Sequence, residues 1–142
     1  MTQQQIVENI YSNVENNLLL HQVVRPNEFD KFRLNITPCE QSLQAAYIKL
    51  DKDKTFKPHK HIFFERNMPI AQESWVVIQG EVLVIYYDLN DEIICERIIK
   101  KGEATITYRG GHNYKSLKED TRIFEYKTGP YLGIEKDKVF IE

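Results

Sequence analysis

The second half of the chain is a succession of short runs rich in β-branched and aromatic residues, separated by turn residues. The clearest pair covers residues 74–79 and 82–87, with Gly80 and Glu81 between them. Two such runs joined by two residues that include a glycine are typical of a β-hairpin. This pattern restricts the fold more than any other feature of the sequence. It predicts strands rather than helices, because an amphipathic helix would need apolar residues three and four positions apart.

Further strand candidates extend this pattern along most of the chain. They cover residues 43–50, 93–99, 104–108, 122–127 and 138–141. Seven or eight short strands without helices between them predict an all-β sandwich or barrel. A parallel α/β sheet would need crossover helices, which the sequence does not show.

One helical candidate lies near the N-terminus, in residues 4–20. Its apolar residues recur at a spacing of four, which suits one stripe of a helix, at Ile6, Ile10, Val14 and Leu18. Several asparagines weaken this pattern. We therefore expect a short N-terminal helical segment of a turn or two before the first strand.

The chain length and charge limit the classes of protein to consider. A chain of 142 residues fits one domain, so we expect a single domain over residues 1–142 with a barrel core at about 43–141. The net charge is −2, from 19 basic and 21 acidic residues. No field of one sign is large enough to recruit nucleic acid or an anionic membrane, so we expect neither as a partner.

The cellular location is inferred from what the sequence lacks. It has no run of 18 apolar residues and no basic, apolar leader at its first residues. The two cysteines, Cys39 and Cys95, stand far apart and form no CxxC pattern, which favours a reducing compartment. We therefore expect a cytoplasmic protein without a membrane span.

Two of the four histidines form the tripeptide His59-Lys60-His61. In an extended strand, residues i and i+2 point to the same face, about 6–7 Å apart. Two imidazoles placed in this way can bind one cation. The alternative is a pair of exposed histidines on a basic strand. His21 has no such partner in the sequence, and a structural role is favoured for it.

Further residues with a regular spacing follow downstream of the histidine pair. Glu73 is followed by six residues and then Gly80, and Gly102 is followed by a strand, two glycines and His112. With the HxH tripeptide, these positions resemble the cupin family over roughly residues 45–127. The family's first motif is HxH, a Glu, six residues and a Gly, and its second is a Gly-flanked strand with one more His. The resemblance implies a cupin-type double-stranded β-helix, that is, a jelly-roll barrel. It also implies one divalent metal ion held by His59, His61, Glu73 and His112.

The sequence departs from the family pattern in the position of the glutamate. Glu65 stands at the conventional distance after the second histidine, whereas Glu73 follows His61 by twelve positions. We choose Glu73 because it has the six-residue spacing to Gly80 and begins an apolar strand. Residues 62–72 then form an inserted loop at the barrel mouth, with Arg66 as a candidate for contacting a ligand.

The expected ligand set restricts the metal and the chemistry. Imidazoles and a carboxylate without thiolates suit Fe(II), Mn(II), Ni(II) or Zn(II). The resemblance favours a metal-dependent enzyme acting on a small sugar-derived or carboxylate substrate, as an isomerase, epimerase or oxygenase. A binding or regulatory module that holds a small ligand without turnover is the alternative, and the sequence does not separate the two.

Candidate residues for proton transfer and for the ligand pocket are drawn from the predicted strands. The candidates for proton transfer are Tyr114, Glu125 and Lys127. Trp75 shares parity with Glu73, although core packing is favoured for it over a role as a platform for a sugar. Tyr126 is a weaker pocket candidate, since parity alone cannot choose which face of residues 122–127 looks inward.

Two short segments resemble one particular subgroup of the cupin family. Gly-Gly-His-Asn at 110–113 and Lys-Thr-Gly-Pro-Tyr at 127–131 resemble a subgroup of small bacterial cupins associated with surface-polysaccharide sugar pathways. Cupins commonly pair through their outer sheet, so the resemblance also implies a homodimer.

Overall fold

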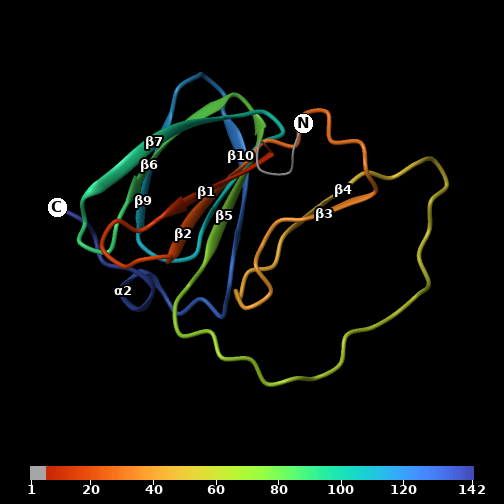
Figure 1. Ribbon diagram of the computed structural model, residues 1–142, viewed down its shortest axis with the longest axis horizontal. Coiled ribbons are helices and arrows are strands. Elements are labelled where there is room, and N and C mark those ends of the chain that lie inside the picture. Colours follow the sequence, from red (N-terminus) through yellow and green to blue (C-terminus); the bar gives the residue numbers. More distant parts are fainter. Residues whose placement is uncertain (1–5) are drawn as a thin grey trace.

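The computed structural model describes residues 6–142, whose regular secondary structure is almost entirely β-strand (Figure 1). The strands are β1 (Val7–Tyr11), β2 (Leu19–Val24), β3 (Arg33–Asn35), β4 (Ala46–Ile48), β5 (Glu73–Gln79), β6 (Glu81–Tyr87), β7 (Ile93–Lys100), β8 (Ala104–Thr107), β9 (Gly111–Ser116) and β10 (Arg122–Lys127). A short helix, α2 (Ile134–Asp137), lies near the C-terminus. No helix within residues 6–142 is long and apolar enough to cross a bilayer.

The strands pair only in antiparallel fashion, in two sheets and a separate hairpin. The larger sheet has the order β1-β2-β8-β5-β10, the smaller has the order β7-β6-β9, and β3 pairs with β4. The all-β prediction is therefore confirmed. The described strands do not close into a barrel, because β9 and β10 are edge strands of separate sheets.

The two strands predicted as a hairpin are present with nearly the expected bounds, but the hairpin prediction itself is wrong. β5 pairs only within the larger sheet and β6 only within the smaller one, so the turn between them carries the chain from one sheet to the other. Residues 74–79 and 82–87 fall within β5 and β6, which are joined at Gly80. Gly80 has φ +81°, and a Cβ built there would lie 2.3 Å from the Thr121 side-chain oxygen. A glycine is needed at this turn because any side chain would meet both a left-handed backbone and a steric clash.

The main core lies between the two sheets. Along β6 every second side chain is buried, as period-2 alternation predicts for a strand with one covered face. The residues of this core come from both sheets: Ile10, Val23, Val77, Val82, Val84, Tyr86 and Ile99. Burial of this apolar surface therefore attaches the smaller sheet to the larger one.

A second core covers the opposite face of the larger sheet. It contains Val24, Ile106 and Tyr108, packed against residues beside the β3–β4 hairpin such as Ile36 and Leu43. The Tyr108 hydroxyl is hydrogen-bonded to the side chains of Gln22 and Thr37. The larger sheet is thus buried on both faces at β2 and β8.

The helical prediction for residues 4–20 is wrong from Val7 onward, whereas Ile6, the first described residue, is helical. Val7–Tyr11 is the strand β1, and a turn with Asn17 at φ 61° leads into β2. The spacing of four misled because Ile10 contributes to the inter-sheet core from a strand. Residues 4 and 5 lie outside the described residues.

Two further strand predictions need correction. Only Ala46–Ile48 of the expected strand 43–50 is paired, with β3. Residues 138–141 are not a strand, although Ile141 reaches Gly111, where a Cβ would lie 2.4 Å from its Cδ1 atom. Of the apolar residues in this segment, Ile141 packs against β9, whereas Val139 and Phe140 are exposed.

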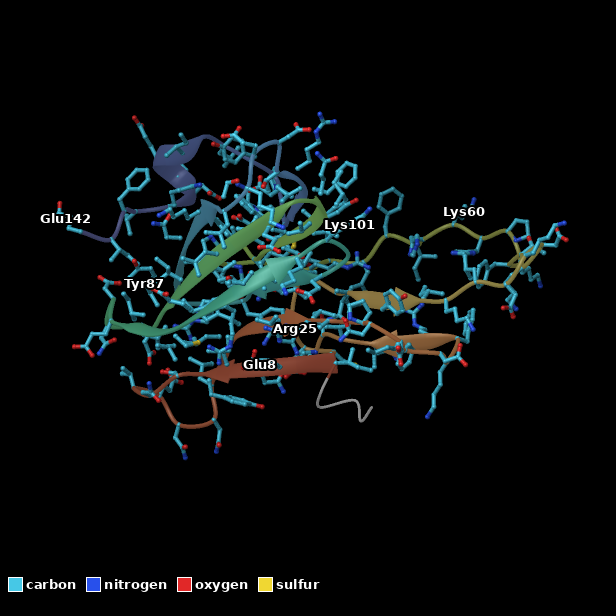
Figure 2. All side chains as sticks on the ribbon, turned by 90° about the horizontal axis from the view of Figure 1, so that it is seen from above. Glu8, Arg25, Lys60, Tyr87, Lys101 and Glu142 are labelled. Atoms are coloured by element: carbon cyan, nitrogen blue, oxygen red, sulfur yellow. The ribbon has the colours of Figure 1, made fainter. Side chains whose placement is uncertain are left out.

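A long loop, residues 49–72, connects β4 to β5 without a helix or strand. It reaches away from both sheets (Figure 1), and Lys60 and Tyr87 lie toward opposite ends of the molecule (Figure 2). Ile62, Phe63 and Phe64 are exposed in it. The expected strand carrying His59 and His61 is therefore not formed in this structure, and the predicted insertion 62–72 belongs to a longer irregular segment.

Neighbouring isoleucines on β7 test where the core lies. Ile99 is fully buried in the inter-sheet core, whereas Ile98 faces outward and is 44% exposed. Ile99→Ala should lower the free energy of unfolding by about 2–5 kcal/mol, because it leaves a cavity. Ile98→Ala should cost less than about 1 kcal/mol. Urea unfolding of the two variants measures the difference, and equal costs would contradict the assigned core.

Candidate functional site

A row of polar side chains crosses one face of the larger sheet. Thr107 on β8 is directly opposite His21 on β2 and Glu73 on β5, and Glu73 is directly opposite Lys127 on β10. Directly opposed residues in antiparallel strands point to the same side of the sheet. The row therefore faces the smaller sheet at one end of the apolar core.

A second row lies two residues along the same strands. Trp75 is directly opposite Glu125 across the β5–β10 pair. The Trp75 indole Nε1 donates a hydrogen bond of 3.0 Å to Glu125 Oε1. Trp75 also packs against the inter-sheet core, in agreement with the packing role favoured for it.

The facing sheet contributes His112 and Tyr114 from β9. His112 Nε2 lies 3.8 Å from Glu73 Oε2. The Tyr114 ring stacks on the Trp75 ring, with centroids 3.6 Å apart and an interplanar angle of 8°. We call the resulting set the polar cluster: Glu73, Trp75, His112, Tyr114, Glu125 and Lys127.

The two carboxyl groups of the polar cluster have opposite protonation behaviour. Burial, with smaller contributions from the hydrogen bond and charge of Glu125, raises the pKa of Glu73 to about 7. The hydrogen bond from Trp75 is the main reason that the pKa of Glu125 is lowered. Glu125 therefore carries the negative charge of the pair, and Glu73 shares a proton near neutral pH.

The two β9 side chains are both neutral at pH 7. Burial, with a smaller contribution from the charge of Lys138, lowers the pKa of His112 to about 4. Burial raises the pKa of Tyr114 above its usual range, so its hydroxyl keeps its proton. A neutral imidazole beside a carboxyl group is a donor pair that divalent metals of the Fe-to-Zn series accept.

The C-terminal segment is attached to the polar cluster through charge. Asp137 of α2 pairs with Lys127 at 3.5 Å and with Lys138 at 3.7 Å. Lys127 also lies over the Tyr131 ring, 4.8 Å from its centroid. The segment after β10 thus brings in a second lysine, Lys138. Its positive charge acts to lower the pKa of both Glu73 and Glu125.

The structure brings together six of the side chains that the sequence analysis singled out and leaves four apart. Those that form the polar cluster include every candidate for proton transfer, Tyr114, Glu125 and Lys127. Three of the others, His59, His61 and Arg66, are exposed in the loop 49–72. Tyr126 points to the opposite face of β10 and is 57% exposed.

The expected metal ligands are divided between these two places. Glu73 and His112 converge, whereas the His59 and His61 rings lie beside each other, 5.7 Å between centroids, in the loop. Among residues 6–142 no group of three or more His, Cys, Asp or Glu side chains is placed to hold a metal ion. As arranged here, the four residues do not form a complete metal site. The metal ion remains a prediction.

Sequence reasoning did not place two neighbours beside the site: His21, for which it favoured a structural role, and Thr107. Thr107 Oγ1 lies 2.8 Å from His112 Nδ1 and 2.9 Å from His21 Nδ1. His21 has no partner nearby in the sequence, and its contact depends on the pairing of β2 with β8, far apart in the chain. The run of apolar residues around it, now β2, was the available signal that His21 occupies a buried strand.

Comparisons of the chain with protein-family models, with curated proteins and with solved structures found no match. The polar cluster is therefore interpreted from its own geometry and chemistry.

Burial of the Glu73 carboxyl group makes the free energy of unfolding depend on pH in a predictable direction. An unfolded Glu73 titrates near 4.5 and the folded one near 7, so ionisation opposes folding of the wild type as pH rises through this window. In metal-free protein, Glu73→Gln should therefore gain stability relative to wild type between pH 4.5 and 7. The gain should be on the order of 1 kcal/mol, because the side chain is only partly shielded from solvent.

Chemical unfolding at pH 4, 6 and 8 measures this gain. Glu65→Gln is the control, because Glu65 is exposed in the loop 49–72. It should give the same difference from wild type at all three values. A Glu73→Gln difference that does not change with pH would show that Glu73 is not desolvated.

Proposed function

We propose that the chain is a metal-binding protein of the cupin type, with a site built on Glu73 and His112. The observation that carries the proposal is the approach of His112 Nε2 to Glu73 Oε2, 3.8 Å apart, from two facing sheets. Two ligands of a tetrahedral ion with bonds of about 2.1 Å lie about 3.4 Å apart. A small adjustment of either side chain would allow both to bind one ion.

The order in which the chain visits the sheets supports a jelly-roll arrangement. β5 is flanked by β8 and β10, while β6 is flanked by β7 and β9. From β5 to β10 the chain therefore passes back and forth between the two sheets, beginning at the β5–β6 connection. Such wrapping of paired strands into two facing sheets is the pattern of a jelly roll.

Completion of the metal site requires residues 57–63 to move to the free edge of β9. β9 pairs only with β6, so its other edge is unpaired among the described strands, and it carries His112. An added strand would place His59 and His61 on one face and could direct both toward the polar cluster. It would also cover part of the exposed apolar surface of Ile62, Phe63 and Phe64.

The function that we favour is a metal-dependent enzyme acting on a small sugar-derived or carboxylate substrate. A bound ion would polarise an oxygen atom of the substrate. Glu125 carries a charge and can accept a proton, whereas the neutral Tyr114 hydroxyl can donate a hydrogen bond to an oxygen atom of the substrate. Lys127 supplies a positive charge beside Glu73 that would attract an anionic substrate group. These roles fit isomerisation or epimerisation, in which one proton is removed and another returned.

The choice of Glu73 over Glu65 is tested by metal affinity. Zn²⁺ or Ni²⁺ titrated into metal-free wild type should bind with a stoichiometry near one. Glu73→Gln should lower the affinity by about tenfold or more, because losses of this size follow even the removal of groups that only support a ligand. Glu65→Gln should leave it unchanged. Calorimetric titration gives both values, and the reverse order, or a wild type that binds no metal, would overturn the proposal.

The movement of the loop is tested by hydrogen exchange. In metal-free protein, the amides of residues 57–63 should exchange rapidly, because the segment forms no strand and is exposed. Saturation with Zn²⁺ should slow their exchange at least about tenfold, since an added strand at β9 protects alternate amides. In the His59→Ala/His61→Ala variant, which changes only exposed side chains, Zn²⁺ should give no protection. Metal binding by wild type without protection of residues 57–63 would show that other groups complete the site.

A further inference from the structure

A chain of hydrogen bonds leads from the backbone of β6 to the polar cluster. His21 Nε2 lies 3.1 Å from the Tyr87 carbonyl oxygen, and His21 Nδ1 lies 2.9 Å from Thr107 Oγ1. The same hydroxyl lies 2.8 Å from His112 Nδ1. All three distances are those of good hydrogen bonds. His21 is fully buried and Thr107 nearly so, so both hydrogen bonds of His21 are shielded from solvent.

The proton positions along this chain follow from its first member. A carbonyl oxygen can only accept, so His21 Nε2 must carry a hydrogen atom and donate it to Tyr87. Burial lowers the pKa of His21 to about 4, so the ring holds only one proton at neutral pH. His21 Nδ1 is therefore a bare acceptor, and the Thr107 hydroxyl must donate to it.

The direction of the next hydrogen bond, between Thr107 and His112, is then determined. The only hydrogen atom of the Thr107 hydroxyl is engaged with His21, so toward His112 its oxygen can only accept. His112 Nδ1 must carry the hydrogen atom that it donates to Thr107. The other ring nitrogen, Nε2, lies on the side that faces Glu73, and it is the one left with a lone pair when the ring carries a single proton.

Tyr114 is the other neighbour of His112 Nδ1, with its hydroxyl 3.4 Å away. A phenolic hydroxyl can donate or accept, so the shorter contact of 2.8 Å with Thr107 decides where the proton lies.

From this geometry we infer that His21 is a positioning residue, which acts through Thr107 to hold His112 in the tautomer with a bare Nε2 in the polar cluster. His112 then offers its lone pair to a metal ion or to a donor group of a ligand without first losing a proton. The tautomer is set by the protein's own residues without a bound ligand. Only the identity of the group that uses the lone pair rests on the proposed function. Neighbours of this kind are what orient histidine ligands in metal sites.

Side-chain ¹⁵N–¹H correlation spectra of the metal-free protein at pH 7 test the inference directly. Wild type should show His21 with its proton on Nε2 and His112 with its proton on Nδ1. Thr107→Val should abolish the single His112 tautomer, giving a mixture or the Nε2-protonated form, and Thr107→Ser should restore it. Unchanged His112 signals in Thr107→Val, or an Nε2-protonated His112 in wild type, would overturn the inference.

Thr105→Val is the matched control. Thr105 is buried on the same strand and faces the same side, but its hydroxyl is bonded to the Tyr86 hydroxyl and not to a histidine. This variant should lose stability without changing either histidine tautomer. If Thr105→Val altered His112 as strongly as Thr107→Val does, the effect would come from general loosening of the core, and the positioning role would be rejected.

Metal titration separates this inference from the proposed function. Zn²⁺ affinity should fall about tenfold in Thr107→Val and should be restored in Thr107→Ser. If the spectra agree with the assigned tautomers but wild type binds no Zn²⁺, the proposed metal site fails and the positioning role stands. If Zn²⁺ binds equally to wild type and to Thr107→Val while the tautomer is unaffected, the positioning role fails and the metal site stands.

Discussion

Two apolar sheet faces pack together around Val77, Val84 and Tyr86, and every contact of the polar cluster that joins the two sheets depends on this packing. Glu73 belongs to one sheet and His112 to the other, so no local element brings them together. Their 3.8 Å approach exists because burial of the apolar residues between the sheets holds the two faces at contact distance. The site is thus a polar end of a hydrophobic core rather than a separate structure.

The same packing controls the charges in the cluster. An apolar surrounding disfavours ionised groups, which raises the pKa of Glu73 and lowers that of His112. Glu125 remains ionised because the Trp75 indole donates a hydrogen bond to it at the more exposed edge of the sheet. The core therefore produces a neutral imidazole, a carboxyl group that is readily deprotonated by a bound cation, and one neighbouring base.

The open edge of β9 and the exposed loop 49–72 are complementary features. An unpaired edge strand and exposed apolar side chains are both unfavourable in an isolated chain. Placement of residues 57–63 along β9 would relieve both and would deliver two imidazoles to the end of the core where His112 lies. Attraction between a divalent ion and the Glu73 carboxylate would add to this driving force, so that strand addition and metal binding would stabilise each other.

The sequence by itself determined the elements whose signals are local. Alternation and turn residues predicted β5, β6, β7, β8 and β10 and the glycine between β5 and β6, because side-chain period and turn geometry act over a few neighbouring residues. It also placed Glu73 at the start of a strand. Tertiary structure decided what depends on distant pairing: β1 is a strand because β2 lies beside it, and β10 turns Glu125 and Lys127 inward and Tyr126 outward because its register with β5 does so. The contact of His21 with His112 through Thr107 has the same origin, since strand register over long sequence separations is set by burial of the whole sheet and not by any local pattern.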